Sequence, residues 1–194
     1  MRTFRLNPTS RSARSASGLP AAVQPSPVLT AFPIAAALLF GLAGPARADL
    51  AGFDRDFVTQ AERANIASIQ DAQWGEKSPV SQPVKRLAQL IIKNRTNASA
   101  DLQTLAQNEN FSLPPLPAVD QQKEAAELRD KHGTALEKAY AQHEVERHQQ
   151  QIALYQRELS EGKNQGVRDY AQKNLPMLKN ELDLAQKVAS ETKQ

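Results

Sequence analysis

The stretch VKRLAQLIIKNRTNASADLQTL, residues 84–105, has the clearest helical pattern in the chain. Its apolar residues recur at spacings of three and four, which places them on one face of an α-helix; they are Val84, Leu87, Ile91, Ala98, Leu102 and Leu105. Ser81 is a good N-cap and Pro83 is tolerated in a first helical turn, so the pattern predicts a helix over about 82–108. Such an apolar stripe is buried only by packing against other helices.

Residue types that favour helices also dominate on both sides of this stretch. Alternating runs of Val, Ile and Thr, which are typical of strands, are absent, whereas Ala, Gln, Glu, Lys and Leu dominate. Gly133 ends a short helix, and Thr134 with Glu137 matches the capping box that opens the next one. Pro176 should kink the last helix. The expected helices span about 54–74, 82–108, 119–131, 135–161 and 165–190.

Four of these helices are long and amphipathic. Short turns join them, apart from a Pro-rich crossover at residues 108–117 that leads into the short helix. Each long helix can bury its apolar stripe only against the other three. The sequence therefore predicts an all-α fold, a four-helix bundle with an extra short helix in the crossover, over residues 53–190.

The first 48 residues differ from the rest of the chain. They hold five arginines and no acidic residue, followed by the apolar run Ile34–Ala43 and the small-residue site Ala46-Arg47-Ala48. A spanning helix needs about 20 apolar residues, so this run is too short for one. Residues 1–48 are expected to be a signal peptide cleaved after Ala48, which predicts a periplasmic location with no stable membrane span after cleavage. The alternatives are a retained N-terminal anchor and a true start downstream of Met1.

Charge and cysteine content exclude several classes of function. The net charge of +3 comes from the leader, because removing its five arginines from 24 Lys+Arg leaves 19 against 21 Asp+Glu, which is −2. No basic stripe interleaved with aromatic residues remains, which argues against nucleic acid as a partner. The absence of cysteine excludes disulfides, thiolate metal sites and a lipid attached to cysteine.

Short motifs along the helices resemble one bacterial family. The first half of the chain carries Phe57-Val-x-x-Ala61, Val84-Lys85-x-x-Ala88 and Leu102-x-x-Leu105-Ala106. The second half carries Leu113-Pro114, Gly133, Tyr140, Val145-x-x-His148 and Leu175-Pro176-x-Leu178. Over about residues 53–190 the chain resembles the "domain of unknown function 4142" family of exported helical bundles without an established activity. The resemblance implies a ferritin-like fold and a role in envelope maintenance or stress tolerance.

The chain departs from this family at several polar positions. Family members typically place a Glu in the first helix, an Asp-His pair in the second, a His in the fourth and a His in the last. The matching residues here are Ser68, Asn94-Arg95, His148 and Glu181. If these positions form a ligand site in relatives, most of its ligating residues are replaced in this chain by residues of different chemistry. A metal site at these positions is therefore in doubt.

The spacing of the histidines also argues against a metal centre. A carboxylate-bridged di-iron site in a helical bundle uses Glu-x-x-His motifs. None occurs, because the residues three positions before the three histidines are Arg129, Tyr140 and Val145. His143 and His148 lie about 140° apart around a helix and cannot share one ion without distortion, and His143 with Glu146 is expected to be a solvated pair. We therefore expect no metal and no cofactor.

Three polar residues interrupt the apolar stripes of three helices. They are Arg95 between Ile91 and Ala98, His148 between Val145 and Ile152, and Glu181 between Leu178 and Ala185. A buried unpaired charge is costly, so we expect Arg95, His148 and Glu181 to meet, with Asn94 nearby. We interpret this buried layer as structural, fixing the register of the helices. The alternative is a small-anion or proton-linked site that uses Arg95 and His148.

No motif of catalysis accompanies this layer. The chain has no nucleophile elbow, no glycine-rich phosphate loop and no paired acid dyad. The sequence predicts an exported, non-catalytic helical-bundle protein that acts through an unknown protein partner in the cell envelope. A ferritin-like metal-binding or redox protein is the main alternative, and a small-anion binder is the second.

Overall fold

The computed structural model describes residue 50 and residues 52–192, so the expected leader at 1–48 lies outside the described residues. The described part is all-helical, which confirms the all-α prediction. Its helices are α1 (Gly52–Lys77), α2 (Gln82–Asn108), α3 (Val119–Arg129), α4 (Gly133–Glu161) and α5 (Gln165–Glu191). None of these helices is both long and apolar enough to cross a membrane.

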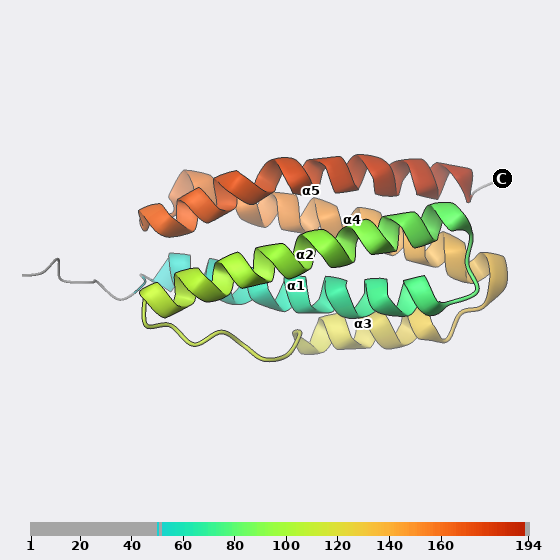
Figure 1. Ribbon diagram of the computed structural model, residues 1–194, viewed down its shortest axis with the longest axis horizontal. Coiled ribbons are helices and arrows are strands. Elements are labelled where there is room, and N and C mark those ends of the chain that lie inside the picture. The colour runs from blue at the N-terminus through green and yellow to red at the C-terminus, as the bar shows by residue number, and fades with distance from the viewer. Residues whose placement is uncertain (1–49, 51, 193–194) are drawn as a thin grey trace, which may run out of the picture. The chain divides into compact units, whose positions relative to one another are not determined.

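The four long helices α1, α2, α4 and α5 pack side by side, and each contacts two of the others (Figure 1). Short turns connect α1 to α2 and α4 to α5, and these two pairs make the most extensive contacts. The remaining long-helix contacts join α2 to α5 and α1 to α4. The short helix α3 follows the crossover 109–118 and lies against α1 and α4, so it covers one side of the arrangement.

The start of α4 differs from the sequence prediction. His132 is the N-cap and Gly133 is the first helical residue, with a φ of 58° that favours glycine. The predicted capping box of Thr134 and Glu137 is wrong, because no side-chain cap forms. Glu137 Oε1 instead accepts the backbone N–H of Ser81 at 2.6 Å. A partner in the α1–α2 turn therefore replaces the local cap.

Apolar side chains gather in two clusters along the long helices. The first lies toward the α1–α2 turn and includes Val84, Leu87, Ile91, Tyr140, Val145 and Val188. The second lies toward the α4–α5 turn and includes Phe57, Val58, Leu102, Tyr155, Tyr170 and Leu178. Between the clusters, each long helix contributes polar side chains to what we call the central polar layer: Ser68, Asn94, Arg95, Glu144, His148, Gln151 and Glu181.

Candidate functional site

Arg95, His148 and Glu181 come from three helices and meet in the central polar layer. Each interrupts the buried apolar face of its helix, and each residue is 0 % exposed. Glu181 Oε2 contacts both Arg95 Nη2 and His148 Nε2, the latter at 3.0 Å. The half-buried Asn94 donates to Glu181 Oε1 at 2.7 Å. The structure thus brings together all four residues that the sequence singled out.

The ring of His148 is held between two acceptors. Its Nδ1 lies 2.6 Å from the backbone carbonyl oxygen of Glu144, which can only accept, so Nδ1 carries a proton. Its Nε2 faces the carboxylate of Glu181. The orientation of His148 is therefore set by α4 on one side and by α5 on the other.

The carboxyl group of Glu181 is ionised in this setting. Burial raises its pKa, but the hydrogen bond from His148 and the positive charge of Arg95 outweigh burial, so the pKa falls below the ordinary value of 4.5. A carboxyl pKa that is lowered on folding contributes stability above the unfolded pKa. We therefore expect this contribution at neutral pH, and we expect it to be lost as the pH falls through the folded pKa.

Glu144 belongs to the same layer, although the sequence analysis did not single it out. It is fully buried, and one of its carboxylate oxygens lies 3.7 Å from His148 Nδ1. The layer thus places two carboxyl groups, of Glu144 and Glu181, beside the guanidinium of Arg95 and the imidazole ring of His148. The position of Glu144 one helical turn before His148 was the available signal, because residues four apart share a helix face.

Neutral polar groups extend the layer toward the second apolar cluster. Gln151 Nε2 donates to Ser68 Oγ at 3.2 Å. Asn65 Nδ2 donates to the hydroxyl of Tyr170 at 3.3 Å, and the hydroxyls of Tyr155 and Tyr170 are 3.2 Å apart. Burial raises the pKa of both tyrosines above the ordinary value of 10.0, so both hydroxyls remain neutral and can donate hydrogen bonds.

Some polar atoms of the layer have no hydrogen-bond partner among the described residues. These are Nε and Nη1 of Arg95, both carboxylate oxygens of Glu144 and Oε1 of Gln151. The free N–H groups of Arg95 would attract a small anion, whereas the carboxylate of Glu144 would repel one. A surface hollow of 440 Å³, lined by residues such as Lys173 and Asn174, reaches the layer at Asn94.

A second charged cluster joins α1, α3 and α4 around the buried carboxylate of Asp71. Arg147 Nη1 lies 2.7 Å from Asp71 Oδ2 in an ion pair without hydrogen-bond alignment. Arg129 and His143 each lie 3.5 Å from an oxygen of the same carboxylate. Sequence reasoning missed this cluster, because no apolar stripe or motif marked Asp71. Its partners become evident only when α4 packs on α1.

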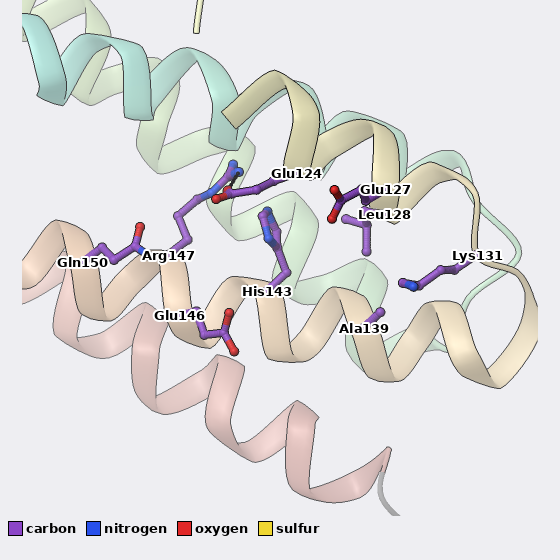
Figure 2. Close-up of a pocket in the computed structure, with 9 residues that line it drawn as sticks. All are labelled: Glu124, Glu127, Leu128, Lys131, Ala139, His143, Glu146, Arg147 and Gln150. Carbon is purple, nitrogen blue, oxygen red and sulfur yellow. Dashed lines mark ion pairs between the residues drawn. The ribbon is translucent and has the colours of Figure 1, made fainter. Parts of the chain in front are cut away.

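Two members of this cluster, His143 and Arg147, line a surface pocket of 220 Å³ between α3 and α4. Figure 2 shows His143 and Arg147 pointing from α4 toward α3, where Glu124 lies 3.9 Å from Arg147. The expectation that His143 and Glu146 form a solvated pair is wrong for His143, whose side chain is only 15 % exposed and faces Asp71. Glu146 is exposed and lines the pocket.

The donor atoms of the central layer do not fit the metal site that the family resemblance implies. Both ring nitrogens of His148 face oxygen atoms of the protein, and the guanidinium of Arg95 has no lone pair to offer a metal. Within residues 52–192, no three His, Asp or Glu side chains converge as a metal-binding group. We therefore assign no ligand role to these residues.

Comparisons with known proteins give a matching family model and a solved structure of similar fold. A family model described as "Domain of unknown function (DUF4142)" matches residues 41–188. The chain is similar to a solved structure, "Crystal structure of DUF305 fragment from Deinococcus radiodurans", with a TM-score of 0.66 and 12 % sequence identity. The match covers 74 % of this chain and 99 % of that chain. At this identity the similarity shows the fold alone. No curated protein has a significant match to the sequence.

Proposed function

The chain belongs to the family described as Domain of unknown function (DUF4142), and from that premise we propose that it is an exported, non-catalytic protein of the cell envelope. The proposed fold is a ferritin-like four-helix bundle, and the proposed location is the periplasm after cleavage behind Ala48. We propose that it acts through protein contacts, in envelope maintenance or stress tolerance. The stress role comes from the family resemblance.

The observation that supports a non-catalytic role is that three side chains of the central polar layer donate their hydrogen bonds to one buried carboxylate. Glu181, the layer's central acceptor, takes hydrogen bonds from Asn94, Arg95 and His148. A catalytic or binding site needs polar groups that converge on an accessible hollow. Here the polar side chains that α2, α4 and α5 contribute to the layer bond to one another in the interior, which supports a role in holding the three helices at a common depth.

A small-anion binder is the second candidate, and one observation favours it. Nε and Nη1 of the buried Arg95 have no hydrogen-bond partner among the described residues. The carboxyl group of Glu144 in the same layer opposes this candidate, because a bound anion would lie beside a second buried acidic group.

We expect thermal melting to separate these functions. In the protein purified from a periplasmic fraction, with Asp49 as its first residue, chloride, nitrate and phosphate should shift the melting temperature no more than they shift it in Arg95→Met. The double variant Arg95→Met/Glu181→Leu takes its place if Arg95→Met alone does not fold. A specific shift in the parent protein would establish the anion binder instead. Iron, zinc or manganese at one ion per chain would establish the metal-binding alternative.

We expect the protein to contact its protein partner through the surface where the crossover 109–118 leads into α3. Leu116 and Val119 are large apolar side chains that are 61 % and 83 % exposed. A photo-crosslinking residue at position 119 should give a discrete protein adduct in cells. The same residue in place of Lys179, an exposed position on α5, serves as the control and should give none. Equal adducts at both positions, or none at 119, would contradict contact through this surface.

A further inference from the structure

Two carboxyl groups lie together at the end of the protein where α1 begins and α4 passes into α5 (Figure 1). Asp54 is in the first turn of α1, and Glu158 is in the last turn of α4. Both residues are 0 % exposed. The two residues lie far apart in the chain, so tertiary packing brings them together.

Asp54 connects the start of α1 to the α4–α5 turn. Its Oδ1 accepts the backbone N–H groups of Lys163 at 2.9 Å and of Asn164 at 3.0 Å. Asn164 in turn caps α5, because its Oδ1 accepts the backbone N–H of Val167 at 3.1 Å. One oxygen of Asp54 thus organises the turn, while its Oδ2 faces away from these donors without a hydrogen-bond partner.

The carboxyl group of Glu158 packs into the same corner. It fills the space over Gly162, where an added Cβ would lie 2.0 Å from Glu158 Oε1. Neither of its oxygens has a donor among the described residues. Glu158 is within hydrogen-bonding reach of Asp54, but two carboxylates are both acceptors. A hydrogen bond between them therefore exists only when one of the two carries a proton.

We propose that Asp54 and Glu158 share one proton and form a proton-dependent clasp that holds the first turn of α1 on the α4–α5 turn. The charged groups acting on Glu158 are Asp54 of α1 and Arg168 of α5. A single negative charge remains on the pair, and the two backbone N–H groups at Asp54 Oδ1 stabilise it. Loss of the proton would place two negative charges side by side in a buried corner.

The direction of the pH dependence follows from Glu158. Burial, followed by the hydrogen bond to Asp54 and its negative charge, raises the pKa of Glu158 to about 8 against the opposing charge of Arg168. The folded protein therefore binds this proton more tightly than the unfolded chain, whose ordinary value is 4.5. Stability from the clasp is fully present below pH 4.5 and is lost as the pH rises through the folded pKa.

Amide hydrogen exchange in the protein expressed from the full chain tests the clasp. After correction for the intrinsic pH dependence of exchange, the protection of the Lys163 and Asn164 amides should fall about tenfold or more between about pH 6 and 9. Glu158→Gln should keep this protection constant, because the amide of Gln donates to Asp54 at every pH. Glu161→Gln, which changes an exposed carboxyl in the same helical turn, should behave like the parent.

The proposal is overturned if the parent shows no pH-dependent loss of protection. It is also overturned if Glu158→Gln shows the same loss as the parent.

Discussion

Glu181→Leu should lower the free energy of unfolding by about 3–5 kcal/mol, the usual cost of removing one partner from a buried ionic group. The substitution removes the acceptor that Asn94, Arg95 and His148 share. Both cations are fully buried, and Glu144 remains as the nearby counter-charge. Urea unfolding followed by the helical circular dichroism signal measures the loss.

Two further variants show whether Glu181→Leu loses stability because it leaves buried charged groups without a partner. Arg95→Met/Glu144→Leu/His148→Leu/Glu181→Leu removes the ionisable groups of the layer together and should recover most of the stability, because apolar replacement of a buried ionic group is often neutral or stabilising. Lys173→Ala breaks a solvent-exposed ion pair, 2.7 Å from Asp101, and should cost no more than about 1 kcal/mol. A loss in Glu181→Leu no larger than that in Lys173→Ala would mean that the layer does not stabilise the fold.

The helices were predictable because their signals are local. For α2 the predicted range and the observed bounds, Gln82–Asn108, agree, since the apolar stripe, Ser81 and Pro83 all lie within the segment or beside it. The start of α4 was not predictable, because Glu137 has a better partner in Ser81 than in its own first turn. Capping rules consider only residues near the start of the helix, so they miss the backbone N–H of Ser81, which tertiary packing brings to Glu137.

The buried polar residues also fall into a group that the sequence predicted and a group that it did not. Arg95, His148 and Glu181 each stand inside an apolar stripe, so their burial follows from periodicity and their contact follows from the cost of an isolated charge. Asp54 and Glu158 lie near helix ends, where polar residues are ordinary and no stripe is interrupted. Their pairing depends on the depth at which α1 meets the α4–α5 turn, which no single segment encodes.

The aromatic contacts of the second apolar cluster lead to the other large expected effect. Phe57→Ala should lower the free energy of unfolding by about 3–5 kcal/mol, as is usual for removing a buried Phe side chain. Phe57 packs edge-on against Tyr155, with ring centroids 5.0 Å apart, and against Tyr170 at 6.2 Å. Phe57→Leu leaves a smaller cavity and should cost less. Urea unfolding measures both variants.

The loss in Phe57→Ala should exceed the cavity cost alone, because Phe57 positions two tyrosines whose hydroxyls bond to each other and to Asn65. With space beside their rings, the tyrosines can shift and break these buried hydrogen bonds. Tyr170→Phe removes the hydroxyl without the cavity, so a double-mutant cycle with Phe57→Ala measures the coupling. We expect a coupling energy above about 0.5 kcal/mol, the limit within which independent sites add. Additive losses would show that the ring packing and the hydroxyl bonds stabilise the protein separately.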